Sequence, residues 1–242
     1  MQSQPSSPPK PVTQIWNPEL VTLPQLTMAR RFFRRLLQYC MRAITSFTMR
    51  ATINGLENLP RQGPALIVSN HQGDADIILF LAVMPSPCEL IMKIENRDDH
   101  WLVGPIFRAY GGLWIHRGRP DRRALRAALD ALAENRIVTV APEGRQTLTG
   151  GLEEGTDGAA FLALKSGAPI IPIAMTGTPN SNTYGSLKKL RRASVTLTVG
   201  KPFLIEQRVD HRTTIRDGTR QIMESIARLL PERFRGKYNY IS

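Results

Sequence analysis

The stretch PALIVSNHQGDADIILFLAV, residues 64–83, decides how the rest of the chain is interpreted. It begins with an aliphatic run at residues 65–68 that lies between turn-forming residues, which is typical of a buried strand. Asp74 then precedes a second apolar run, and an aspartate in that position predicts a helix N-cap. His71 is therefore predicted to lie in a strand-to-helix turn, with Asp76 in the first turn of the helix.

This placement gives His71 and Asp76 a possible chemical role. The helix macrodipole favours an ionised carboxylate in the first turn, and an ionised Asp76 can accept a hydrogen bond from an imidazole. Such a bond fixes the tautomer of His71 and leaves its other ring nitrogen free to take a proton from a substrate hydroxyl. The alternative is structural, because polar turns before helices often carry His and Asp for capping.

Two other chemistries fit the sequence poorly. A zinc or iron site needs three or four ligands, and the four histidines of the chain occur at no metal-ligand spacing. We therefore predict no metal. A Ser-His-Asp hydrolase is not favoured either, because Ser69 lies on the strand two residues before His71 and no G-x-S-x-G elbow occurs.

Three more stretches also combine an apolar run with residues that could belong to a functional site. They are VTVAPEGR at residues 138–145, GGLWIHR at 111–117 and APIIPIA at 168–174. In the first, a short β-branched strand ends in Pro142-Glu143-Gly144-Arg145. A glycine lets the backbone turn closely at that point, and the guanidinium of an arginine presents a fork that suits phosphate.

Together with SNHQGDAD at residues 69–76, these stretches resemble the sequence blocks of the glycerolipid acyltransferases. That family acylates glycerol 3-phosphate and lysophosphatidate, and its blocks are Asn-His-(four residues)-Asp, Gly-x-x-Phe-Ile-x-Arg, Pro-Glu-Gly-Thr-Arg and a proline-containing strand. The four occur here in the right order, over roughly residues 50 to 231. One position departs from the pattern, since Arg145 follows Gly144 directly without the threonine of the family.

The resemblance implies transfer of an acyl group from an acyl thioester, either acyl-CoA or acyl-acyl carrier protein, to a lipid hydroxyl. The acceptor it favours is the lysophospholipid 1-acyl-sn-glycerol 3-phosphate, which would give phosphatidic acid in phospholipid biosynthesis. It implies no cofactor beyond this co-substrate. His71 would be the general base and Asp76 its partner. The implied substrate-binding residues are Arg117, Glu143, Gly144 and Arg145.

Each of these substrate-binding residues has an expected task. Arg117 and Arg145 would converge on the acceptor phosphate from the ends of two strands. Glu143 would orient an arginine or the glycerol hydroxyl, and Gly144 would serve the backbone turn. An ordinary salt bridge is the alternative for each arginine.

Other functions remain open at this point. Within the same class, the acceptor could be another lysolipid, glycerol 3-phosphate or an amino-lipid. From a different class, the chain could be a catalytically silent membrane adaptor that uses its basic segments to bind anionic lipid. The presence of both His71 and Asp76 argues against the silent adaptor.

The pattern of elements predicts a single α/β domain. The chain has 242 residues, of which 42% are hydrophobic, which is enough for one large core. Strands alternate with helices, so we expect a mixed, mostly parallel central sheet covered by helices. The proposed boundaries are a proline-rich disordered or loosely docked tail at residues 1–26, a basic amphipathic helical segment at 27–50 and the acyltransferase domain at 51–242.

The sequence also predicts local details of this domain. Residues 177–187 are polar and glycine-bearing and are interpreted as a mobile loop, and residues 195–199 as an outer strand. His116 is interpreted as a partly exposed strand residue, because no carboxylate has a fixed spacing to it. Cys40 and Cys88 lie in apolar settings and are expected to be reduced thiols.

The net charge of +12 is unevenly placed. Residues 28–50 carry six arginines and no acid, and residues 186–220 carry the remaining excess, so the positive field is confined to two segments. This distribution predicts contact with an anionic surface. Nucleic acid is not favoured as that surface, because no RNP, zinc-finger or helix-turn-helix pattern accompanies the charge.

The segment at residues 27–50 predicts how the protein meets a bilayer. Apolar residues recur in it at helical spacing among the arginines, and its charge-free runs are far shorter than the ~20 residues a spanning helix needs. We therefore expect a helix in the membrane interface, and a peripheral or monotopic protein on the cytoplasmic face. No secretory leader is visible. The alternative interpretation of residues 27–50 is a helix that packs on the domain with its arginines in solvent.

Overall fold

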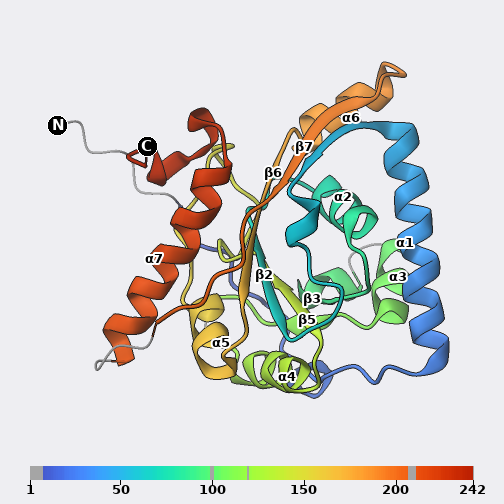
Figure 1. Ribbon diagram of the computed structural model, residues 1–242. Helices are drawn as coiled ribbons and strands as arrows, with labels where there is room; N and C mark the ends of the chain where they lie inside the picture. The colour runs from blue at the N-terminus through green and yellow to red at the C-terminus, as the bar shows by residue number, and fades with distance from the viewer. Residues whose placement is uncertain (1–7, 99–100, 119, 207–210, 242) are drawn as a thin grey trace.

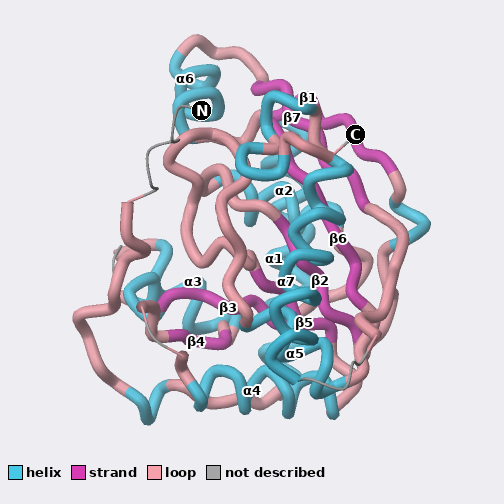
Figure 2. Tube along the Cα trace, turned by 90° about the vertical axis from the view of Figure 1, so that its left-hand side faces the viewer, coloured by secondary structure: helices cyan, strands magenta, loops and turns pink. Residues whose placement is uncertain are grey.

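The computed structural model describes residues 8–98, 101–118, 120–206 and 211–241. Its centre is a seven-stranded sheet in the order β1-β7-β6-β2-β5-β3-β4. Every neighbouring pair is parallel except β6 with β7. The prediction of one α/β domain with a mixed, mostly parallel sheet covered by helices is therefore confirmed (Figures 1 and 2).

The strands are β1 (Met49–Asn54), β2 (Ala65–Ser69), β3 (Glu89–Lys93), β4 (Leu113–Ile115), β5 (Ile137–Val140), β6 (Ile170–Thr176) and β7 (Ala193–Val199). The α-helices are α1 (Met28–Thr48), α2 (Ala75–Val83), α3 (Val103–Tyr110), α4 (Arg122–Ala133), α5 (Gly158–Ser166), α6 (Asn180–Lys188) and α7 (His211–Leu229). Short 3-10 helices occupy Pro18–Leu20, Leu56–Asn58, Ile94–Arg97, Glu232–Phe234 and Gly236–Tyr238.

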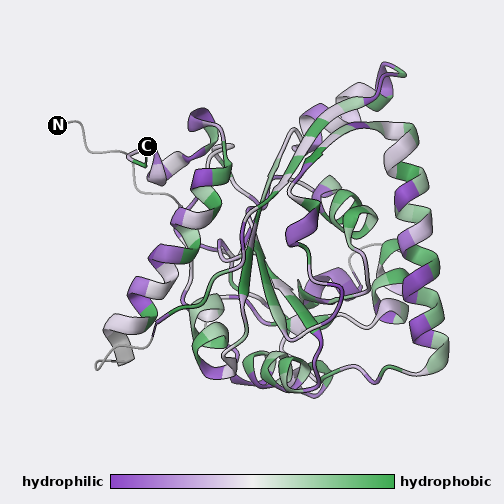
Figure 3. Ribbon diagram, viewed as in Figure 1, coloured by the Kyte–Doolittle hydropathy of each residue, from purple (hydrophilic) through white to green (hydrophobic). Residues whose placement is uncertain are grey.

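The sheet separates two apolar cores. Helices α4, α5 and α7 pack on one face, and α2 packs on the other with α1 and α3 outside it (Figure 1). The central strands are buried on both sides, which is why they are continuous aliphatic runs and are coloured almost entirely as hydrophobic in Figure 3. Leu66 of β2 is paired with Val138 of β5. The carboxyl ends of β2 and β5 therefore lie side by side, and this juxtaposition positions the site described below.

Two expectations about the carboxyl-terminal half were wrong. The stretch interpreted as a mobile loop at residues 177–187 contains α6, which forms although Gly185 and several Asn, Ser and Thr residues have low helix propensity. Thr183 on its inner side is buried, so tertiary packing outweighs local preference. The strand interpreted as the outer one is β7, and the edge is instead β1, because α1 ends at Thr48 and the chain enters the sheet at once.

The tail that precedes α1 is docked on the domain from residue 8 onward. Thr13 exchanges backbone and side-chain hydrogen bonds with Arg117, and the carbonyls of Pro18 and Pro24 accept from arginines of the α4 region. Residues 8–26 thus make specific contacts with the domain, while residues 1–7 lie outside the described residues. Figure 1 shows this segment passing below α4 to reach the start of α1.

Helix α1 has two different apolar faces. Phe33 and Leu37 pack on the core, whereas Phe32 and Phe47 point outward and are 70% and 80% exposed. One arginine does not face solvent, because Arg34 is buried in an ion pair with Glu89. Five arginines of residues 28–50, and not six, therefore remain outside the core. Among the described residues, no helix is long and apolar enough to cross a bilayer.

Candidate active site

The histidine and aspartate of the opening stretch meet in the turn between β2 and α2. His71 Nδ1 lies 2.7 Å from Asp76 Oδ2. The same oxygen accepts backbone N–H bonds from Gln72 and Gly73, at 2.7 and 3.1 Å. Asp76 is buried, whereas the His71 side chain is 34% exposed. The predicted contact between the two side chains is therefore present.

This arrangement determines the tautomer of His71. An ionised carboxylate only accepts hydrogen bonds, so Nδ1 carries the proton and Nε2 keeps its lone pair. Among the described residues, Nε2 of His71 has no hydrogen-bond partner, so this nitrogen could accept a proton.

The helix N-cap was predicted with one error. Asp74 occupies the N-cap position of α2, but its side chain makes no capping hydrogen bond. Its carboxylate instead accepts from the amides of Gln146 and Asn180 and from the hydroxyl of Tyr184. Asp74 therefore links the turn before α2 to the loop after β5 and to α6.

Glu143 supports the histidine from the neighbouring strand. It is fully buried in the loop after β5, where Oε1 accepts the backbone N–H of His71 at 2.9 Å and Oε2 accepts that of Glu153 at 2.7 Å. The expectation that Glu143 orients an arginine or a substrate hydroxyl is not met by these contacts. Its side chain holds the backbone of the turn that carries His71.

Burial raises the pKa of Glu143 from 4.5 to about 7, against the opposing effect of the two N–H bonds. The native state therefore binds this proton more tightly than the unfolded chain, so Glu143 lowers the free energy of unfolding as the pH rises from about 4.5 to about 7. We expect this contribution to reach about 3 kcal/mol and to vanish in Glu143→Gln. Urea unfolding of both proteins at a series of pH values measures the difference in slope, and equal slopes would contradict it.

Asn70 is a supporting residue that the sequence analysis quoted without assigning a role. Its side-chain amide donates to the carbonyl of Met175 at 2.8 Å, and its carbonyl accepts the N–H of Met175 at 2.7 Å. The end of β2 is thereby tied to β6 directly before the histidine. The available signal was its place next to His71 in a polar turn, since a buried Asn there needs backbone partners.

Arg145 lies in the same loop and is already engaged. The positive φ of +71° at Gly144 turns the chain, as expected for a glycine with a backbone role. Arg145 is buried and donates through Nε to Glu153 Oε2 at 2.7 Å. Its Nη1 donates to the carbonyls of Pro8 and Pro9 at 3.0 and 3.1 Å. The tail therefore occupies the side of Arg145 that was predicted to hold phosphate.

Arg117 is placed differently. Its side chain pairs with Glu95 at 3.5 Å, and its backbone is hydrogen-bonded to Thr13 of the tail. Within the described part of the chain, no contact joins it to the other predicted site residues. The structure thus brings together His71, Asp76 and Glu143 with the loop of Arg145, and leaves Arg117 apart.

A second histidine–aspartate pair was missed. His116 is buried, not partly exposed, and its Nδ1 lies 2.7 Å from Asp121 Oδ2. The spacing of five residues is the same as in the first pair, so the statement that no carboxylate has a fixed spacing to His116 was wrong. Its Nε2 accepts the backbone N–H of Asn17 at 3.1 Å, and the ring of Trp16 covers it. This imidazole has no open nitrogen and serves to hold the tail.

Asp121 also caps α4 by accepting the N–H groups of Arg123 and Ala124. Burial opposes ionisation of Asp121, but hydrogen bonds from His116 and from Ala124 outweigh it and lower its pKa. The stabilisation that this carboxylate contributes is therefore lost as the pH falls through its native pKa.

Replacing His116 by alanine should destabilise the protein without removing the base. The change leaves Asp121 buried without the ring and the N–H of Asn17 without an acceptor, so we expect a loss of about 2 to 4 kcal/mol of unfolding free energy. Turnover should stay within about tenfold of wild type, because His71 is untouched. Thermal melting and initial rates at a temperature where both proteins are folded test this.

The chain resembles known proteins in both sequence and fold. A family model described as Acyltransferase matches residues 50–176. A 1-acyl-sn-glycerol-3-phosphate acyltransferase of Chlamydomonas reinhardtii is 29% identical over 85% of this chain and 63% of its own length. The human 1-acyl-sn-glycerol-3-phosphate acyltransferase alpha is 30% identical over 54% of this chain and 47% of its own.

A solved structure has the same fold. The crystal structure of the 1-acyl-sn-glycerophosphate (LPA) acyltransferase of Thermotoga maritima aligns with a TM-score of 0.60, over 83% of this chain and 81% of that one, at 23% identity. The chain spans between about half and 63% of the length of the curated relatives named above.

Proposed function

The chain belongs to the acyltransferase family, and from this premise we propose that it acylates 1-acyl-sn-glycerol 3-phosphate to give phosphatidic acid. The acyl donor would be a thioester, either acyl-CoA or acyl-acyl carrier protein. The observation that carries the proposal is the 2.7 Å contact between His71 and the buried Asp76, with the second ring nitrogen left open.

The reaction follows from this geometry. Nε2 of His71 takes the proton of the acceptor hydroxyl while the oxygen bonds to the thioester carbonyl carbon. The carbon–sulfur bond then breaks, and the leaving thiolate takes the proton back from Nε2. Asp76 stabilises the imidazolium between the two steps. A thioester is activated enough that no enzyme nucleophile is needed.

The acceptor phosphate is proposed to bind Arg145. Two partners of this guanidinium are neutral carbonyls of the tail, at Pro8 and Pro9. A phosphate oxygen carries charge and is the stronger acceptor, so it would displace them. Binding of the acceptor would thus lift residues 8–10 from the loop. Arg117 is the second candidate and would have to leave Glu95.

The surface beside the site suits a lipid substrate. A small apolar pocket of about 70 Å³ lies between α1, α2 and α6, and its lining includes Ala75, which directly precedes Asp76. Exposed apolar side chains occur on α1, on α6 and in the turn between α6 and β7. They are Ile44, Phe47, Tyr184, Leu187 and Leu190. We propose that this side of the molecule rests on the cytoplasmic face of a membrane, with the protein peripheral or monotopic.

Removing the outward phenylalanines of α1 tests the membrane contact. Phe32→Ser/Phe47→Ser should weaken co-sedimentation with anionic vesicles by about tenfold or more, because each buried aromatic ring contributes about 1.5 to 3 kcal/mol. The matched control is Leu204→Ser/Tyr240→Ser, which removes exposed apolar groups outside α1 and α6. An equal loss of vesicle binding in both variants would favour the alternative, in which α1 only packs on the domain.

A panel of possible acceptor lipids tests which acceptor the protein uses. Purified protein is incubated with labelled oleoyl-CoA or oleoyl-acyl carrier protein and, in turn, with lysophosphatidate, other lysophospholipids, glycerol 3-phosphate and an amino-lipid. We expect the fastest product formation with lysophosphatidate. A faster rate with another acceptor would assign that acceptor. Transfer to none of them would favour the silent adaptor.

A further inference from the structure

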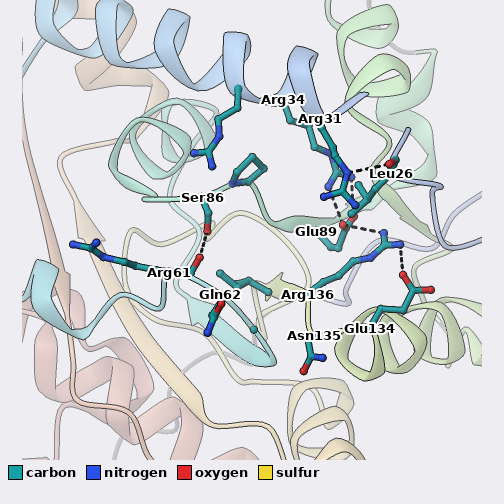
Figure 4. A pocket seen from close by; sticks show the side chains of 14 residues that line it. Leu26, Arg31, Arg34, Arg61, Gln62, Ser86, Glu89, Glu134, Asn135 and Arg136 are labelled. Atoms are coloured by element: carbon teal, nitrogen blue, oxygen red, sulfur yellow. Dashed lines mark hydrogen bonds and ion pairs between the residues drawn. The ribbon is translucent and has the colours of Figure 1, made fainter. Parts of the chain in front are cut away.

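A basic pocket lies at the opposite end of the sheet from His71. Its volume is about 420 Å³, and it is bounded by α1 and by the chain segments that lead into β2, β3 and β5 (Figure 4). His71 and Glu143 follow β2 and β5, whereas this pocket is lined by residues that precede them. Because β2 has five residues, the two sites are separated by roughly 17 Å of strand.

The floor of the pocket is a fixed ion-pair network. Glu89, 1% exposed, accepts a bidentate pair of bonds from Arg34, both 2.8 Å long. Arg136 approaches Glu89 from the other side at 3.2 Å and also donates to the carbonyl of Pro24. Figure 4 shows both guanidinium groups converging on Glu89. These arginines are used by the fold and rigidly define the shape of the floor.

The rim carries positive charge that the floor does not neutralise. Five arginines and two glutamates line the pocket, a net charge of +3. Arg31 and Arg35 from α1 each use one nitrogen on a backbone carbonyl, of Leu26 and Pro85. Arg61 comes from the loop before β2, and among the described residues its guanidinium has no hydrogen-bond or ion-pair partner. All three rim arginines are exposed.

We propose that this pocket is a second ligand site, which takes a phosphate group. Exposed arginines from two separate elements surround a concavity, and a guanidinium fork matches phosphate oxygens in both geometry and charge. The volume lies within the roughly 300 to 1,000 Å³ usual for small-molecule sites. Such a phosphate would join α1, through Arg35, to the loop of Arg61.

The phosphate can come from a lipid headgroup or from a soluble ion. Arg31 and Arg35 lie on α1 next to the outward apolar face that holds Phe32, so a headgroup at a bilayer surface could reach the rim. This site does not depend on acyl transfer, and its binding is measured without an acyl donor. Failure of the proposed enzymatic function and failure of this site are therefore separate results.

The test compares two double variants of equal charge. Arg35→Gln/Arg61→Gln removes two rim arginines and leaves the Arg34–Glu89–Arg136 network intact. Arg122→Gln/Arg126→Gln removes two exposed arginines of α4 that do not line the pocket. The full chain is titrated calorimetrically with inorganic phosphate, and separately with phosphatidylcholine vesicles that contain about one-fifth phosphatidylglycerol.

We expect the rim variant to lose about tenfold or more in affinity for at least one probe, and the α4 variant to stay within about twofold. Loss with both probes would identify the phosphate group itself as sufficient, and loss with the vesicles alone would identify the lipid headgroup. Equal losses in the two variants, or no loss in the rim variant, would overturn the site. Arg35→Lys/Arg61→Lys should recover part of the affinity, and melting curves check that each variant is folded.

Discussion

Replacement of His71 by alanine is expected to abolish acyl transfer, with a fall in kcat/KM of about 10³-fold or more. General base catalysis contributes roughly 10² to 10⁴ in rate, and the variant lacks the imidazole that would take the hydroxyl proton. Initial rates of phosphatidate formation from lysophosphatidate and oleoyl-CoA measure this loss.

The loss should not come from unfolding. The backbone of His71 is held by Glu143 and by Thr147, and neither contact uses the imidazole. The side chain is 34% exposed, so its removal opens no buried cavity. The melting temperature should therefore be close to that of wild type. A variant that melts normally and keeps more than about a tenth of the wild-type rate would remove His71 as the base.

Asp76→Asn should be nearly as severe, with a loss of about 10² to 10⁴ in kcat. One oxygen of Asp76 accepts from the ring and from two backbone N–H groups, so an asparagine carbonyl in its place can keep the turn. The amide is neutral, however, and cannot stabilise the imidazolium that forms during the reaction. If the amide group rotates instead, its NH₂ faces Nδ1 and forces the wrong tautomer.

The second pair provides a matched control for this variant. Asp121 also accepts from a histidine ring and from backbone N–H groups, at the same sequence spacing. Asp121→Asn should lower the melting temperature and change kcat much less than Asp76→Asn does. The reason is that the tail occupies His116, because Asn17 donates to its Nε2 and Trp16 packs on its ring. Similar losses of kcat in both variants would contradict the separation of catalytic and structural roles.

Much of the fold could be predicted because its central strands are buried on both faces. Runs such as residues 65–68 and 170–175 have no polar interruption, so their place in the sheet follows from hydrophobicity alone. The prediction failed where packing decides the outcome. Helix α6 has weak intrinsic propensity, and β1 follows α1 without any turn residue to mark the change.

The site was predictable to the extent that its contacts are local. His71 and Asp76 are five residues apart in a strand-to-helix turn, so sequence spacing places them together. His116 and Asp121 have the same spacing, but spacing cannot decide whether the other ring nitrogen is free. Nε2 of His116 is occupied by the tail, which lies about a hundred residues away in the sequence. The partners of Glu143 and Arg145 depend on how the loops around Glu153 fold, and no periodic pattern encodes that arrangement.

The most direct test of the account measures phosphatidate made by the purified wild-type chain. The protein is mixed with labelled lysophosphatidate and oleoyl-CoA in parallel with the His71→Ala variant, and lipid products are separated. We expect phosphatidate with wild type and at most a trace with the variant. Equal amounts from both proteins, or none from wild type with either oleoyl-CoA or oleoyl-acyl carrier protein, would contradict it.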